Sequence, residues 1–215
     1  YRCADHPHLD GIVRDFCAEL DARPRELVLA SAGYLHAGVV VNRNLAWPLV
    51  PATLARDLGL ERVRFLNDFE ALAHAIAHVD DSSSVSLKAA FVPDADTGPV
   101  AVIGPGTGLG AAVWFPGDPP RVLATEAGQI QLAARGGLER EILDRIAPPD
   151  SHTPYEAVLS GPGLHRLYAA LCAVYDRYPA CAEPADVVDA AQAGDEVAYE
   201  ALQLFGGWMG SFAGD

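Results

Sequence analysis

Residues Ala101 to Phe115, AVIGPGTGLGAAVWF, form an apolar run, a glycine-rich turn and a second apolar run. Thr107 lies among four alternating glycines, which are Gly104, Gly106, Gly108 and Gly110. Glycine permits positive φ and close approach of a bulky anion, and successive N–H groups in such a turn form a concavity for phosphate. Because the residues after Gly110 are apolar and β-prone, we expect the turn to join two strands.

The residues that follow the turn argue against two familiar phosphate loops. A Walker loop has a Lys after its last Gly, and a dinucleotide fingerprint opens a helix there; this sequence has neither feature. A hairpin that binds no ligand remains the alternative, because a lone G-x-G pattern is a weak signal. The hydroxyl of Thr107 among the glycines favours phosphate.

The overall composition is that of a soluble globular protein. Half of the 215 residues are hydrophobic and 20% are charged. Acidic residues outnumber basic ones by 29 to 15, which argues against nucleic acid or an anionic membrane as the main partner. A phosphate-bearing ligand would then depend on backbone N–H groups and a metal ion. No apolar stretch approaches the roughly 18 residues of a membrane span, and no signal peptide is visible.

The cysteines and histidines do not predict a metal site. His74 and His78 lie four residues apart on an expected helix, but without a third ligand a solvated face is favoured. The cysteines are scattered and form no C-x-x-C pair, which indicates free thiols in a reducing compartment, the cytoplasm: Cys3, Cys17, Cys172 and Cys181.

Apolar periodicity predicts an α/β fold. In the first half of the chain helices and strands alternate, with helices at 8–20, 51–58 and from 69, and strands at 26–32, 38–41, 63–66 and 85–93. Residues 93–98, PDADTG, are the best linker, so we expect domains at 1–96 and 97–215. The second domain is expected to hold the glycine hairpin, a strand near Val122, a turn at 126–129 and helices at 138–146, 154–159, 163–178, 185–193 and 196–212.

Asn67 and Asp68 stand between an expected strand and an expected helix. A carboxylate in this position is well placed to act as a general base on a substrate hydroxyl. Asn and Asp are also favoured helix N-caps, so capping alone would explain either residue. It explains the pair less well, because one cap is enough.

Three more polar residues are candidates, each with a structural alternative. Glu126 lies at a turn in an apolar neighbourhood and Gln129 follows it, and a surface turn would account for both. Glu156 ends the sequence Thr153-Pro-Tyr-Glu, which reads as a capping box with Pro at the first helical position. Glu156 is therefore either a helix cap or a ligand-binding carboxylate.

The order of these motifs resembles that of the bacterial glucokinase family, in the sugar kinase, Hsp70 and actin superfamily. The match runs along nearly the whole chain, and it is carried by Leu66-Asn-Asp-Phe, Gly106-Thr-Gly-Leu-Gly and Leu159-Ser-Gly-Pro-Gly-Leu. Ala32-Gly33 and Asn44-Leu-Ala-Trp47 also look like a segment of this family, with Tyr34 where a Pro is usual. The resemblance implies an α/β, actin-like (ribonuclease H-like) sugar kinase fold of two lobes that close over glucose and MgATP, with a boundary near 94–98.

The resemblance also implies an activity, phosphorylation of glucose by ATP at the 6-hydroxyl as the first step of glycolysis. Asp68 would take the proton from that hydroxyl, and Asn67 would hold neighbouring hydroxyls. Glu126 and Glu156, with Gln129 beside them, would hold the hydroxyls at the anomeric end of the ring. The ATP phosphates would lie against Gly104, Gly106, Thr107 and Gly108, with Mg²⁺ offsetting the acidic surroundings. A homodimer is compatible with the resemblance.

The sequence departs from the family pattern in three places. Gln129 stands where the family has His, which could shift the sugar preference. The family's N-terminal D-x-G-G-T phosphate loop and its C-terminal adenosine segment are absent. The chain opens at Tyr1 without a Met and stops at Asp215 directly after a helical pattern. We therefore expect the interior of a longer kinase, which alone would lack efficient catalysis.

Two other functional hypotheses remain open on the sequence. The first is a sugar-binding protein or regulator of the same fold without turnover, or a kinase for a different hexose. The second is an α/β hairpin protein with none of these sites, in which the turn at 104–110 holds no ligand and Asp68 is buried. Hexose binding without phosphoryl transfer would identify the former.

Overall fold

The computed structural model describes residues 1–42, 47–79, 82, 84–87, 98–148 and 150–214. The chain divides into two compact units, Tyr1–Pro93 (unit 1) and Asp94–Asp215 (unit 2), and each is described by itself. Apart from residue 98, the expected linker lies outside the described residues, as does most of the strand expected at 85–93. Residues 85–87 of that segment are described and are not in a strand.

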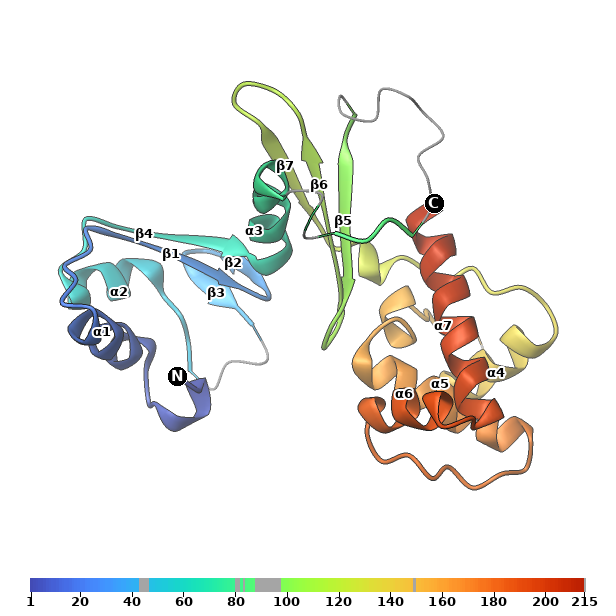
Figure 1. Ribbon diagram of the computed structural model, residues 1–215. Coiled ribbons are helices and arrows are strands. Elements are labelled where there is room, and N and C mark those ends of the chain that lie inside the picture. The colour runs from blue at the N-terminus through green and yellow to red at the C-terminus, as the bar shows by residue number, and fades with distance from the viewer. Residues whose placement is uncertain (43–46, 80–81, 83, 88–97, 149, 215) are drawn as a thin grey trace. The chain divides into compact units, whose positions relative to one another are not determined.

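Unit 1 is built on a pair of parallel strands, β1 and β4, with α1 and α2 on one face of the pair (Figure 1). Its elements in chain order are η1 (Cys3–Asp5), α1 (Leu9–Glu19), β1 (Glu26–Ser31), β2 (Tyr34–His36), β3 (Val39–Val41), α2 (Pro51–Leu58), β4 (Arg62–Asn67), α3 (Asp68–Ala75) and η2 (Ile76–His78).

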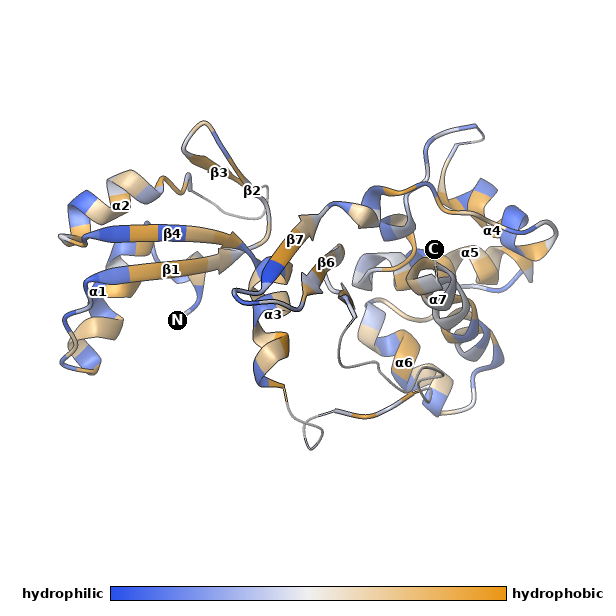
Figure 2. Cartoon of the chain, turned by 90° about the horizontal axis from the view of Figure 1, so that it is seen from above, coloured by the Kyte–Doolittle hydropathy of each residue, from blue (hydrophilic) through white to orange (hydrophobic). Residues whose placement is uncertain are grey.

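Local sequence signals account for several of these elements. α2 begins with Pro51, whose missing N–H costs nothing at the first helical position, and ends at Gly59 in the left-handed conformation. Along β1, half-buried and exposed residues alternate, and Val28 on the open face is 56% exposed. Figure 2 shows that β1 and β4 are hydrophobic over much of their length, as expected for parallel strands.

The segment after β1 folds into a hairpin of β2 and β3, where the sequence predicted a joining segment and only the second strand. Ala37 and Gly38 at its tip both have positive φ, 48° and 82°, which is the backbone of the tight turns that suit a twisted two-residue hairpin. Ala37 is not a residue that signals such a turn, so sequence reasoning missed β2. A Cβ on Gly33, at φ +100°, would overlap the carbonyl oxygen of Val41, so the hairpin requires glycine there.

Unit 2 combines an antiparallel sheet with a group of helices (Figure 1). Its elements are β5 (Val100–Pro105), β6 (Leu109–Phe115), β7 (Arg121–Thr125), η5 (Ala127–Gln129), α4 (Leu138–Ile146), η6 (Tyr155–Ala157), α5 (Gly161–Val174), α6 (Pro184–Gln192) and α7 (Glu196–Gly214). The sheet order is β5-β6-β7, and Pro105 pairs with Leu109 across the glycine turn. The prediction that this turn joins two strands is confirmed.

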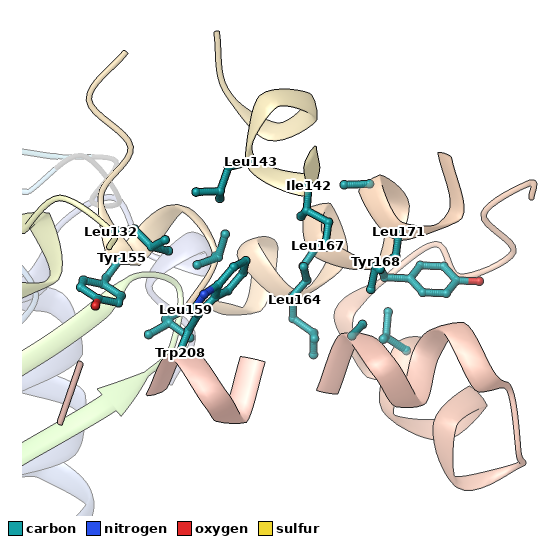
Figure 3. Close-up of a cluster of buried hydrophobic side chains, with 14 of the residues drawn as sticks. Leu132, Ile142, Leu143, Tyr155, Leu159, Leu164, Leu167, Tyr168, Leu171 and Trp208 are labelled. Carbon is teal, nitrogen blue, oxygen red and sulfur yellow. The ribbon is translucent and has the colours of Figure 1, made fainter. Parts of the chain in front are cut away.

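The core of unit 2 gathers around α5, as the side chains of Figure 3 show. Leu167 and Leu171 of α5 are fully buried, as is Ile142 of α4. Trp208 of α7 is 3% exposed, and its Nε1 donates a hydrogen bond to Glu139 Oε2 at 3.2 Å. The buried helix-to-helix contacts give the glycine turn and its neighbours a rigid support.

All four cysteines are free, and two of them lie in the core of unit 2. Cys172 and Cys181 are buried beside Tyr168, whose hydroxyl accepts a hydrogen bond from Ala180 N at 3.3 Å. Burial raises the pKa of the Cys172 thiol. Burial, followed by contacts with the two cysteines, also raises the pKa of Tyr168. Cys172 and Tyr168 are therefore neutral packing residues near neutral pH.

None of the helices in the described ranges combines the length and the apolar character that a membrane crossing would need.

Candidate functional site

In unit 1, Asn67 caps helix α3, whereas the neighbouring Asp68 is not the capping residue. Asn67 is the N-cap of α3, and its Oδ1 accepts hydrogen bonds from Phe69 N at 2.9 Å and Glu70 N at 3.3 Å. Glu70 Oε2 accepts in return from Asn67 N at 3.2 Å, which completes a capping box. Asn67 therefore supplies the cap, and capping does not explain Asp68.

Asp68 is the first residue of α3 and is half-buried. Its Oδ1 accepts a hydrogen bond from Phe69 N at 3.0 Å, while its Oδ2 has no donor among the residues that the structure describes. The side chain stands in the first turn of α3, where the backbone amides have no acceptor within the helix. The side chain is thus held by one oxygen, and among the described residues the other is left without a donor.

Asn67 and Asp68 lie at the carboxyl ends of the parallel strands β1 and β4. Asn67 ends β4 opposite Ser31, which ends the parallel strand β1. Asn67 Nδ2 donates to the Gly33 carbonyl at 3.2 Å, so the segment after β1 is tied to the start of α3. The carboxyl ends of parallel strands are the common position of ligand sites in such sheets.

In unit 2, the glycine turn reverses at Thr107. Gly106 N donates to Gly108 O at 2.8 Å, and the carbonyl of Gly106 accepts from Gly161 N, also at 2.8 Å. The amides of Thr107 and Gly108 have no acceptor within the described ranges, and Thr107 is exposed. Gly104 lies further down β5, where it pairs with Gly110.

This turn fits a phosphate group. Two of its amides have no acceptor among the described residues, and the hydroxyl of Thr107 is exposed. A Cβ on Gly106 would meet no atom within 4 Å, so an anion has room to approach. The contact from Gly161, the first residue of α5, also brings the positive end of that helix to the turn. Of the four residues predicted at this site, Gly106, Thr107 and Gly108 form the open tip.

Glu156 is directed at the glycine turn and does not cap a helix. Its Oε2 accepts from Leu109 N at 2.9 Å and its Oε1 accepts from Gln129 Nε2 at 3.0 Å. The helix predicted over 154–159 is wrong: residues Tyr155–Ala157 form a single 3-10 turn without a side-chain cap, and the next helix begins at Gly161. The capping-box interpretation fails because Thr153 N donates instead to Gln131 Oε1 at 3.0 Å.

Gln129 and Glu126 lie on the short turn after β7. Gln129 N donates to the Glu126 carbonyl at 2.9 Å, and both side chains are exposed. The carboxylate of Glu126 has no hydrogen-bond partner in the part of the chain that is described. Unit 2 therefore brings together two carboxylates and one amide, which could accept hydrogen bonds from hydroxyl groups.

Two further residues, which sequence reasoning did not single out, position this group. Ser160 is 2% exposed; its Oγ accepts from Gly163 N at 3.0 Å as the N-cap of α5 and donates to the Glu156 carbonyl at 2.9 Å. A Ser before Gly-Pro at a helix start is a readable capping signal. His152 Nε2 lies 2.9 Å from the Gln129 carbonyl, and no local pattern would have indicated it.

Replacing Ser160 with Ala is expected to cost about 1–2 kcal/mol of stability, because Gly163 N loses its acceptor and Glu156 O loses its donor. Chemical denaturation of the two proteins measures the difference. Ser211→Ala is the matched control, since Ser211 Oγ only donates to Gly207 O within α7. Equal stability of the two variants would contradict the role given to Ser160.

His74 and His78 have no further ligand near them: among the described residues, no group of three or more His, Cys, Asp or Glu side chains could hold a metal ion. The candidate residues thus form two groups. Asn67 and Asp68 belong to unit 1, while the glycine turn, Glu126, Gln129 and Glu156 belong to unit 2.

Comparison with known proteins gives one consistent match. The glucokinase family profile matches residues 1–215. A glucokinase-like protein of Xylella fastidiosa is 42% identical over 218 residues, and a glucokinase of Rhizobium etli is 34% identical over 227 residues. All of this chain is covered in both alignments, and the chain spans 64% and 63% of the length of these relatives.

The fold comparison agrees with the sequence comparison. A crystal structure of glucokinase from an Antarctic psychrotroph is 32% identical, with a TM-score of 0.81 over 100% of this chain and 67% of that one. The predicted fold class, the α/β actin-like fold of sugar kinases, is confirmed.

Proposed function

Because the chain belongs to the glucokinase family, we propose that the protein is an ATP-dependent hexose kinase that phosphorylates glucose at its 6-hydroxyl. The observation that carries the proposal is the division of tasks at the start of α3: Asn67 caps the helix and leaves one oxygen of Asp68 without a donor among the described residues. A carboxylate held in this way is suited to act as a general base. We further propose that units 1 and 2 correspond to the two lobes expected at 1–96 and 97–215.

In this proposal Asp68 accepts the proton of the sugar's 6-hydroxyl as that oxygen attacks the γ-phosphorus of ATP. The new bond joins the sugar oxygen to phosphorus, the bond from phosphorus to the β,γ-bridging oxygen breaks, and ADP leaves with the electron pair. Asn67, Glu126, Gln129 and Glu156 bind the remaining hydroxyls. The amides and hydroxyl of the glycine turn bind ATP phosphates, and Mg²⁺ supplies charge neutralisation.

The residues of the glycine turn support binding of a phosphate-bearing donor such as ATP. The tip of the glycine turn offers amide donors and open space but no lysine or arginine side chain, so a metal ion would have to offset the phosphate charge. We place the reaction in the cytoplasm, where the free cysteines are chemically stable. The homodimer stays a prediction.

The test is formation of glucose 6-phosphate by the purified full-length protein with ATP and Mg²⁺, followed through a coupled NADPH assay. We expect turnover with glucose and a weaker rate or none with mannose, fructose and galactose. The proposal would be refuted if neither glucose nor any of the other three hexoses were phosphorylated.

A non-catalytic sugar-binding protein or regulator is the second candidate. It is favoured by Gln129, which stands where the family pattern has His. One N–H of its Nε2 is donated to Glu156 Oε1 at 3.0 Å, and its second N–H and its side-chain oxygen, which meet no partner among the described residues, stay available to a sugar hydroxyl. Calorimetry would identify it: hexose binding at micromolar to millimolar Kd without any phosphoryl transfer would support this candidate over the kinase.

A further inference from the structure

We propose that Glu156 is a positioning residue that couples hexose binding to nucleotide binding. Inside unit 2 it joins the glycine turn to residues 126–132, the sugar-binding segment, which carries Glu126 and Gln129. The inference rests on the proposed function and deepens it. It goes beyond the role of Glu156 as a hydroxyl acceptor, because it concerns the two contacts that the carboxylate already makes with the protein.

The first contact sets the shape of the glycine turn. Glu156 Oε2 accepts from Leu109 N, the first amide after the turn, at 2.9 Å. On the other arm, Gly161 N donates to Gly106 O at 2.8 Å. The segment from Glu156 to Gly161 therefore holds both arms of the turn, and the amides of Thr107 and Gly108 between them keep one orientation.

The second contact leads to the sugar-binding segment. Glu156 Oε1 accepts from Gln129 Nε2 at 3.0 Å. Backbone hydrogen bonds join the segments that carry these two residues, from Tyr155 N to Ile130 O at 3.0 Å and from Leu132 N to Thr153 O at 2.9 Å. A sugar hydroxyl that binds Glu156 or Gln129 therefore acts on the Glu156 carboxylate, and this carboxylate also orients the glycine turn through Leu109 N.

The contacts of Glu156 require glycine at position 108. A Cβ at that position would overlap Glu156 Oε2, whereas the φ of Gly108 lies outside the left-handed region. Gly108→Ala is therefore compatible with the backbone and displaces only the end of a flexible side chain. This substitution moves the Glu156 carboxylate away from Leu109 N while the residue itself stays in place.

The coupling is measured as the ratio of two dissociation constants of the nucleotide, one without glucose and one with glucose bound. Calorimetry of the full-length protein with Mg²⁺ and AMPPNP, a non-hydrolysable ATP analogue, gives the nucleotide Kd without glucose and at saturating glucose. We expect glucose to tighten AMPPNP about tenfold in the unsubstituted protein, within the usual range of such couplings. Gly108→Ala and Gln129→Ala should each bring the ratio to within about twofold of one.

The double variant and a matched control complete the test. Because both substitutions interrupt one chain of contacts, Gly108→Ala with Gln129→Ala should give the same ratio as either alone. Gly136→Ala makes the same chemical change in open space and should keep the full ratio. If Glu156 had only a structural role, the single variants would bind AMPPNP more weakly both without glucose and at saturating glucose. The ratio of these two dissociation constants would then stay unchanged.

The outcomes separate this inference from the proposed function. If glucose binds and is phosphorylated but the ratio is near one in the unsubstituted protein, or survives in both single variants, the coupling role is refuted and the kinase stands. If the unsubstituted protein neither binds nor phosphorylates a hexose, the proposed function fails and the coupling role fails with it.

Discussion

Replacing Asp68 with Asn is expected to lower kcat for glucose phosphorylation by about 10²- to 10⁴-fold, the usual contribution of a positioned general base. Asn has the same shape as Asp, and its amide oxygen can still accept the hydrogen bond from Phe69 N. Asn67 and Glu70 keep the capping box of α3. The substitution therefore removes the proposed base and leaves the fold in place.

The readout distinguishes catalysis from binding. The rate of glucose 6-phosphate formation should fall, while the Kd for glucose from calorimetry should change by no more than about threefold, less than 1 kcal/mol. Asp57→Asn is the matched control: it makes the same change in unit 1, at an exposed carboxylate paired with Arg56, and should keep full turnover. Retention of turnover in the Asp68 variant would remove Asp68 from the mechanism.

Replacing Gly33 with Ala is expected to destabilise unit 1 by about 3 kcal/mol or more, from left-handed backbone strain together with steric overlap. The new Cβ would overlap the carbonyl oxygen of Val41, a backbone atom that cannot move alone. The carbonyl of Gly33 also accepts from Asn67 Nδ2, so the start of α3 should be disturbed as well.

Gly38→Ala separates the two causes. Gly38 has φ +82°, but a Cβ there would meet nothing within 4 Å, so its variant carries the strain without the overlap and should cost about 1 kcal/mol. Hydrogen exchange of unit 1, resolved by mass spectrometry of its peptides, measures both variants. Equal protection in the two variants would show that the overlap at Gly33 has no energetic weight.

Much of the secondary structure could be read from apolar periodicity and capping signals. The helix expected at 138–146 has the bounds of α4, and the expected helix at 51–58 has those of α2. These helices contain strong local signals, such as Pro51 at the first position of α2. The glycine turn was recognisable because apolar, β-prone runs lie on both sides of it.

The role of Glu156 could not be read in this way. Its sequence fits a capping box, but the donor that holds it, Leu109 N, is 47 residues away. Local propensity favours the cap, and a tertiary contact overrides it. The choice between Asn67 and Asp68 as the cap of α3 was open for the opposite reason: both residue types cap well, and only side-chain geometry shows which one does.

The placement of the cysteines makes the two units separately observable. Unit 1 contains Cys3, which is exposed, and Cys17, which is half-buried, whereas Cys172 and Cys181 of unit 2 are buried. An alkylating reagent should modify Cys3 at once but reach the unit 2 pair only when that unit opens. Mass spectrometry of the modified chain would then time the opening of unit 2 independently of unit 1, and would show whether a bound nucleotide analogue slows it.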